Sequence, residues 1–157
     1  MTTGWTEDGA AVVERYIEAA PATVFALFRT REAWLSWQGV DATIEPEPGG
    51  AFRIDIRGDG WISGAFVEVV EDQRLVFTWG WEGPDAPYPV APGESTVEIE
   101  LTAEGDGTRL RLTHRIAMPE LEEQTRVCWE HYIERLGIRA AGGDPGPDPM
   151  VAAASEE

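Results

Sequence analysis

The stretch LVFTWGW, from Leu75 to Trp81, alternates large and small side chains. Successive side chains of a strand point to opposite faces, so the leucine and the three aromatic rings share one face. Each ring carries about 150–250 Å² of buriable surface. At about 25 cal/mol/Å² three such rings represent roughly 11–19 kcal/mol of gross burial, which equals or exceeds the net stability of a typical domain. The rings must therefore be covered, either by side chains from a helix or inside a cavity.

The same period-two pattern recurs along the chain. Strands are expected over residues 10–18, 51–57, 61–70, 75–81, 95–103 and 108–115. The last two flank a Glu-Gly-Asp-Gly turn and predict a hairpin in which Ala103 pairs with Thr108. That register puts Glu100 opposite Arg111 on the outer face.

Helical signals stand at two places. Pro21 suits the first turn of a short helix because its φ is fixed. Thr30 is a suitable N-cap for a second short helix, which brings Trp34 and Trp37 together at spacing i, i+3. A longer helix is expected near the C-terminus, where one face collects Thr125, Cys128, Trp129, Tyr132, Ile133 and Leu136.

This order of elements predicts an α+β fold. A sheet with one apolar face must cover it, and the last helix is the only long amphipathic element available. We expect a curved antiparallel sheet wrapped around that helix, with two short helices after the first strand. The expected organisation is a flexible leader over 1–9, a single domain over 10–141 and a polar Pro/Gly-rich tail over 142–157.

Composition limits the classes of function. The chain has 29 acidic and 12 basic residues, a formal net charge of −17, and it contains no lysine. Such a surface repels phosphate backbones and anionic lipids, so neither nucleic acid nor a membrane is an expected partner. Without lysine there is no Schiff-base catalysis. The single cysteine, Cys128, fits a reducing compartment, and with no signal peptide or apolar span in sight we expect a cytoplasmic protein.

Short motifs spread over residues 11–139 carry a family resemblance. They are Ala20-Pro21 with Val24-Phe25, the Trp34/Trp37 pair, Gly49-Gly50, Gly64, Arg74 to Trp79, Thr96-Val97 with Leu101, and Gly107 to Leu110 with Leu112 to His114. In this order they resemble the helix-grip proteins related to the activator of Hsp90 ATPase, within the START-like (SRPBCC) superfamily that includes Bet v 1 and polyketide cyclases. The resemblance implies a cavity between sheet and long helix that often holds an apolar ligand.

The chain departs from this family in two ways. Members often carry His-x-x-Gly-Trp in the long helix, of which only Trp129 is kept here. The chaperone-binding surface of the eukaryotic namesake uses lysine-rich motifs, which a chain without lysine cannot match. The resemblance therefore implies the fold more strongly than the activity.

We expect the ligand-binding residues to be inward-facing side chains of the sheet, the short helices and the long helix. They are Trp34, Trp37, Phe52, Ile54, Phe77, Trp79, Trp81, Leu112, His114, Trp129, Tyr132 and Ile133. No metal ligand is assigned, because two separated histidines and one cysteine do not form a metal cluster. No catalytic residue and no cofactor are assigned either.

His114 and three residues outside this list need separate interpretation. His114 could orient a ligand or act as an acid or base, or it could be a hydrogen-bonded structural histidine. Arg15 could point into the cavity or outward, Cys128 is expected to be a buried structural thiol, and His131 is expected to be solvated.

Three functions fit these features. The first is non-catalytic binding of a small, largely apolar or aromatic molecule, with sequestration of a toxic compound as one version. The second is a cyclase or aromatase-like enzyme that uses His114, Tyr132 and Arg15. The third is a protein-binding module, similar to a co-chaperone, with an unknown partner. The five polar groups expected among the inward-facing rings favour a cavity over a filled core.

Overall fold

The computed structural model describes residues 2–58, 60–83, 90–116 and 118–151. Within these residues the strands are β1 (Thr2–Glu7), β2 (Ala10–Ile17), β3 (Asp41–Ile44), β4 (Ala51–Asp55), β5 (Trp61–Val70), β6 (Arg74–Trp81), β7 (Ser95–Glu104) and β8 (Gly107–Arg115). The helices are α1 (Pro21–Ala26), α2 (Arg31–Leu35) and α3 (Pro119–Ala140).

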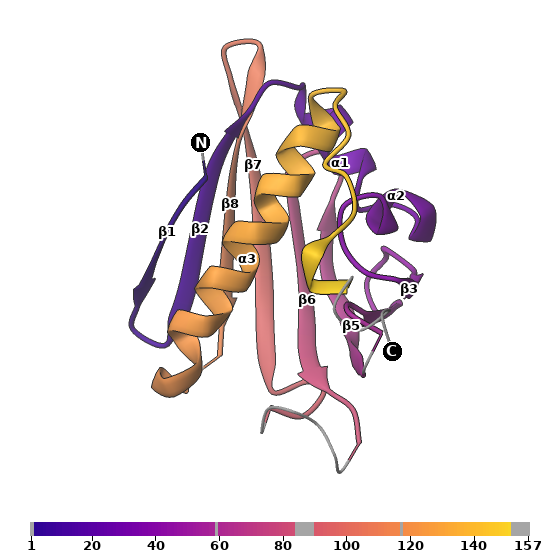
Figure 1. Cartoon of the computed structure of the whole chain (residues 1–157), viewed down its shortest axis with the longest axis vertical. Coiled ribbons are helices and arrows are strands. Elements are labelled where there is room, and N and C mark those ends of the chain that lie inside the picture. The colour runs from indigo at the N-terminus through magenta and orange to yellow at the C-terminus, as the bar shows by residue number, and fades with distance from the viewer. Residues whose placement is uncertain (1, 59, 84–89, 117, 152–157) are drawn as a thin grey trace.

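The strands form one antiparallel sheet in the order β1-β2-β8-β7-β6-β5-β4-β3. The sheet curves around α3, which crosses one face, while α1 and α2 lie beside the other end of that face (Figure 1). The predicted α+β helix-grip architecture is confirmed. No helix in the described part of the chain is both long and apolar enough to cross a membrane.

The hairpin between β7 and β8 has the predicted register. Ala103 pairs with Thr108, and Glu100 stands opposite Arg111. The alternation of apolar and polar residues fixes this register, because a slip by one residue would turn the apolar side chains to solvent.

The prediction of a flexible leader over residues 1–9 is wrong for residues 2–7, which form strand β1. This strand pairs with β2 along its whole length, from Thr2 opposite Arg15 to Glu7 opposite Ala10. Its sequence is mostly polar, and its side chains are half-buried or exposed, so it lacks the apolar alternation that marked the other strands. Arg15 joins β1 and β2 to α3, since its Nη1 donates to Thr2 Oγ1 at 2.8 Å and to Glu134 Oε1 at 2.6 Å.

The residues at the ends of α2 and α3 explain where these helices begin or stop. Thr30 caps α2 as predicted, accepting a hydrogen bond from the Ala33 N–H at 3.1 Å. Helix α3 begins at Pro119, earlier than the apolar face that starts at Thr125, because proline in the first turn and two acidic residues there favour an N-terminus. Gly142 ends the helix with a positive φ of 95° that few other residues adopt.

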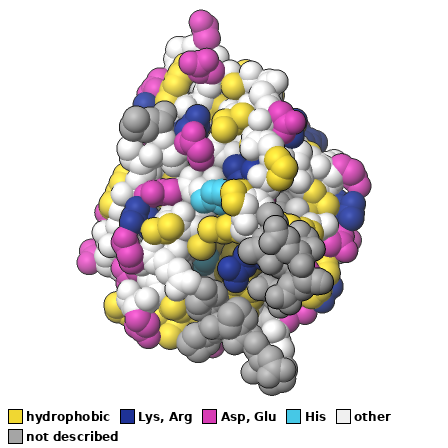
Figure 2. Space-filling view, viewed as in Figure 1, with side chains coloured by type: hydrophobic (Ala, Val, Ile, Leu, Met, Phe, Trp, Pro, Cys, Tyr) yellow, Lys and Arg dark blue, Asp and Glu magenta, His cyan; other side chains and the backbone are white. Residues whose placement is uncertain are grey.

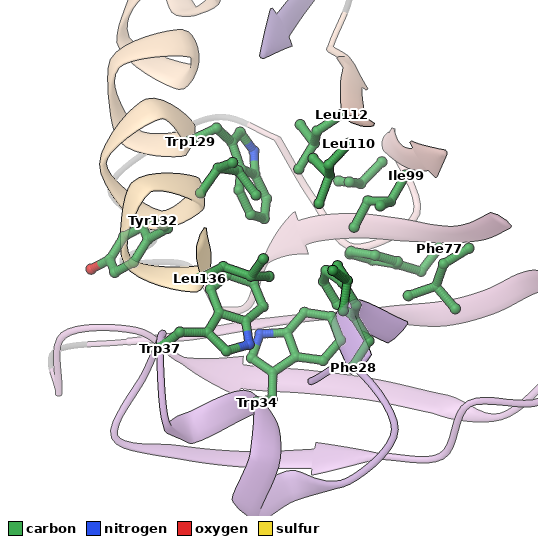
Figure 3. Close-up of a cluster of buried hydrophobic side chains, with 14 of the residues drawn as sticks. Phe28, Trp34, Trp37, Phe77, Ile99, Leu110, Leu112, Trp129, Tyr132 and Leu136 are labelled. Atoms are coloured by element: carbon green, nitrogen blue, oxygen red, sulfur yellow. The ribbon is translucent and has the colours of Figure 1, made fainter. Parts of the chain in front are cut away.

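One half of the space between sheet and helices is a filled aromatic core. It is built from the rings of Phe28, Trp34, Trp37, Phe52 and Phe77. Leu136 of α3 lies beside Trp34 and Trp37 in this core (Figure 3). The Trp34 and Trp37 rings stack at 5.5 Å, and the Phe52 and Phe77 rings lie 4.4 Å apart. All five rings are at most 1% exposed. For this half, the filled-core interpretation is right.

Candidate functional site

The other half of the space contains a cavity of about 320 Å³. It is bounded by the end of β6, the end of β8, the first half of α3 and the chain that follows α3. Its walls are Gln38, Ile56, Arg57, Trp79, Trp81, Val90, His114, Ile116, Leu121, Gln124, Thr125, Val127, Cys128, Trp129, Tyr132 and Met150. In the view of Figure 2, hydrophobic side chains gather near the centre of this face and acidic ones lie mostly around its margin.

The structure divides the sequence-predicted site residues into two groups. Five line the cavity: Trp79, Trp81, His114, Trp129 and Tyr132. The other seven lie outside its lining, in the buried core: Trp34, Trp37, Phe52, Ile54, Phe77, Leu112 and Ile133. The stretch LVFTWGW therefore serves both purposes, because Phe77 fills the core whereas Trp79 and Trp81 form a cavity wall.

His114 lines the cavity and is held by hydrogen bonds to two groups, Trp129 and Ser95. Its Nδ1 accepts from the Trp129 indole N–H at 3.1 Å, and its Nε2 lies 2.9 Å from Ser95 Oγ. The Ser95 hydroxyl donates to the Trp79 carbonyl oxygen at 2.6 Å, so its oxygen is left to accept from the imidazole. These bonds assign the neutral tautomer with its proton on Nε2. Burial lowers the pKa of His114 from 6.5 to about 3.

The chain after α3 folds back beside that helix (Figure 1). Asp148 accepts from the Tyr132 hydroxyl at 2.7 Å, and its second oxygen lies 2.9 Å from His131 Nε2. Met150 follows and lines the cavity. His131, which was expected to be solvated, is partly exposed and contacts Asp148, and the polar tail predicted from residue 142 makes specific contacts in its described part. Burial and the hydrogen bond to Asp148 raise the pKa of Tyr132 far above its usual range.

The three groups proposed for acid–base chemistry do not converge. Both nitrogens of His114 are engaged, the Tyr132 hydroxyl is bound by Asp148, and Arg15 is outside the lining, bound to Glu134. The Cys128 thiol does line the cavity, and burial raises its pKa, which disfavours the thiolate. Among the described residues no three His, Cys, Asp or Glu side chains are grouped so as to hold a metal ion.

Gln38 is a cavity residue that the sequence analysis did not single out. It follows α2 and is 2% exposed, and its Oε1 accepts from the Trp34 indole N–H at 2.9 Å. The available signal was the spacing i, i+4 between Trp34 and Gln38, which places the two side chains on one face of a helical turn.

Comparisons with known proteins identify the family of the chain. A sequence model of the family described as "Activator of Hsp90 ATPase homolog 1-like protein" matches residues 18–140. The human activator of 90 kDa heat shock protein ATPase homolog 1 is 32% identical over 117 residues, which cover 72% of this chain and 31% of the human protein. The mouse homolog 2 is 28% identical over 120 residues, covering 73% of this chain and 33% of the mouse protein. The chain thus spans about a third of the length of these curated relatives.

Solved structures extend the likeness to the whole fold. An AHSA1-like protein from Rhizobium etli is 41% identical and superimposes with a TM-score of 0.69, covering 95% of this chain and 92% of that protein. A protein from Mesorhizobium loti has a TM-score of 0.72 at 22% identity, covering 82% of this chain and 93% of that protein, a likeness that concerns the fold alone.

Proposed function

The chain belongs to the family of activator of Hsp90 ATPase homolog 1-like proteins, and starting from that membership we propose that it binds one small, largely apolar molecule with an aromatic ring. The single observation that carries this proposal is the cavity of about 320 Å³ between β6, β8 and α3. Sequestration of such a compound is the specific version that we favour.

The cavity wall has the chemistry expected of a binding site for such a molecule. Ligand pockets are mostly apolar concavities of about 300–1,000 Å³ with a few polar groups that fix orientation. Here Trp79, Trp81 and Trp129 contribute indole rings, and Tyr132 contributes the apolar part of its ring. Aromatic rings pack against one another in offset or edge-to-face geometry, which favours a flat unsaturated ligand over a flexible aliphatic one.

The same geometry supports binding over catalysis. An acid–base enzyme needs a group with a pKa near the operating pH and within reach of the reacting atom. The pKa of His114 is far below neutrality, and that of Tyr132 is far above it. Their hydrogen bonds go to other protein groups, so they hold the cavity in shape.

A second candidate, a protein-binding module, is favoured by one observation. The human relative with 32% identity is named as an activator of a heat-shock protein ATPase. The chain matches about a third of that protein, and its net charge of −17 would suit a basic partner.

Native mass spectrometry of freshly purified protein tests the proposal. We expect an additional mass of a few hundred daltons that is lost on denaturation. Emission from the cavity tryptophans should then change when an apolar aromatic panel is titrated in, and the change should be reduced in Trp79→Phe. Trp5→Phe is the matched control, because Trp5 lies on the edge strand β1 and is not part of the cavity lining.

A protein without a bound molecule would contradict the proposal. If the mass is that of the bare chain, and neither emission nor melting temperature responds to the panel, the ligand-binding proposal fails and the protein-binding module becomes the leading function.

A further inference from the structure

We propose that Gln38 donates a hydrogen bond to the ligand, and that the cavity therefore selects neutral, planar aromatic molecules that carry a carbonyl or a similar oxygen acceptor. This inference rests on the proposed function, since it specifies the chemical class of the molecule bound in the same cavity.

The orientation of the Gln38 amide is fixed by the protein. Its Oε1 accepts from Trp34 Nε1 at 2.9 Å, and an amide flip would place two donors against each other. Trp34 itself cannot turn, because its ring is fully buried and packs against Phe28, Trp37 and Phe52. The NH₂ end of the amide is consequently held in one direction.

That NH₂ group lacks an acceptor within the part of the chain that the structure describes. No hydrogen bond from it is present there, and the Gln38 side chain forms part of the cavity wall. Among the described residues the fully buried side-chain atoms without a partner are Arg15 Nε and Arg139 Nε, so the Gln38 nitrogen is open to the cavity, where an acceptor can reach it. The structure thus offers a donor, fixed in place, to an acceptor inside the cavity.

A second donor belongs to a residue of the cavity lining. Among the described residues the Trp79 indole N–H also has no hydrogen-bond partner, in contrast to Trp129, Trp34 and Trp37, whose indoles donate to His114, Gln38 and the Leu27 carbonyl oxygen. Two unmatched donors favour a ligand that presents oxygen acceptors over one that presents donors.

The charge of the site favours a neutral ligand. Arg57 is the one charged side chain in the described lining, and it already has an interaction partner. A carboxylate would lose its hydration in an apolar cavity and would also approach a protein of net charge −17. A ketone or quinone oxygen accepts the same hydrogen bond without that cost.

Fluorene and fluorenone test the inference, because they share a flat three-ring shape and differ in the carbonyl. We expect the wild-type protein to bind fluorenone about five- to ten-fold more tightly than fluorene, as one hydrogen bond with a donor in the cavity wall predicts. In Gln38→Met the preference should fall below about two-fold while fluorene is still bound. Gln73→Met is the matched control, because Gln73 is an exposed glutamine in the turn between β5 and β6, outside the cavity lining, and its replacement should preserve the preference.

Gln38→Met also leaves the Trp34 indole N–H without its acceptor and could disturb the core. A second measurement therefore uses the wild-type protein. Fluorenone, but not fluorene, should shift the side-chain NH₂ resonance of Gln38 downfield in a ¹⁵N-labelled sample. Equal affinities for the two compounds, or an unmoved resonance with fluorenone bound, would overturn the role of Gln38 and leave the binding function standing. If neither compound binds in any variant, the aromatic-ligand function falls as well.

Discussion

His114 illustrates how one buried residue can link the cavity to pH. Its imidazole is 1% exposed and neutral, with a pKa of about 3 in the folded chain against 6.5 in water. Between these two values the unfolded chain binds the proton and the folded chain does not. The contribution of neutral His114 to the free energy of unfolding is therefore fully present above pH 6.5 and is lost as the pH falls toward 3.

From pH 7.5 to pH 5.0 this linkage predicts a loss of about 2 kcal/mol in the free energy of unfolding. Urea titrations at both pH values measure it. Other groups also titrate, so the quantity of interest is the difference between wild type and His114→Gln, which keeps a donor and an acceptor but has no proton to bind. Parallel pH profiles for the two proteins would mean that the folded imidazole ionises normally, against the structure.

Residue-level prediction succeeded where a residue is apolar and its face is set by periodicity. Trp79, Trp81 and Trp129 were placed toward the space between sheet and helix, and they line the cavity. It failed for Gln38, since nothing in its local sequence says that Trp34 will take one end of the amide and leave the other unpaired. Hydrogen-bond partners depend on distances that residue types do not fix.

At the scale of elements, the segment after α3 is the main departure from expectation. Residues 142–157 contain proline and glycine without periodicity, which predicted a tail, yet Asp148 has an 8% exposed side chain and receives hydrogen bonds from α3. Strand β1 was missed for a related reason, because its pairing with β2 uses backbone groups that leave no apolar pattern. The β7–β8 hairpin was predicted in register because turn and alternation agree locally.

Asp148→Ala should release this segment from the helix. Burial alone would raise the pKa of the Asp148 carboxyl, but the hydrogen bonds from Tyr132 and His131 outweigh it and hold the pKa below 3.8. The segment should therefore be docked at neutral pH and come loose as pH falls below about 4. We expect the variant to lose about 1–3 kcal/mol of docking free energy at neutral pH.

Hydrogen exchange provides the measurement. The amide of Val151, which donates to the Asp148 carbonyl oxygen at 3.0 Å, should lose its protection in Asp148→Ala while the amides in the middle of α3 keep theirs. Asp144→Ala is the control, because the Asp144 side chain is 80% exposed and contacts neither Tyr132 nor His131. Since Met150 lines the cavity, release of the segment should also speed ligand dissociation. Full protection of Val151 in Asp148→Ala would show that other contacts hold the segment.

For the whole molecule, the predictable part was the architecture, and the unpredictable part was where filled core gives way to cavity. One apolar sheet face and one long helix leave few arrangements, so an α+β fold with a curved sheet around the last helix followed from the pattern, and the helix-grip type followed from the family resemblance. Trp34 and Trp37 turned out to seal one half of the space, whereas the first half of α3 leaves the other half open. That division depends on how far the helix stands from the sheet, and composition does not set this distance.

The net charge of −17 separates the two candidate functions through salt. Raising NaCl from 10 to 500 mM shortens the screening length from about 30 Å to a few ångströms, which weakens the repulsion between the acidic side chains. The folded chain should then gain stability on the order of 1 kcal/mol, and its melting temperature should rise by about 2–4 °C. A neutral aromatic ligand in the cavity feels little of this field, so its dissociation constant should change less than about two-fold. A basic protein partner held by the acidic surface would instead lose at least about tenfold in affinity over the same range. Binding of fluorenone that weakened steeply with salt would therefore contradict a neutral ligand inside the cavity and place the interaction on the charged surface.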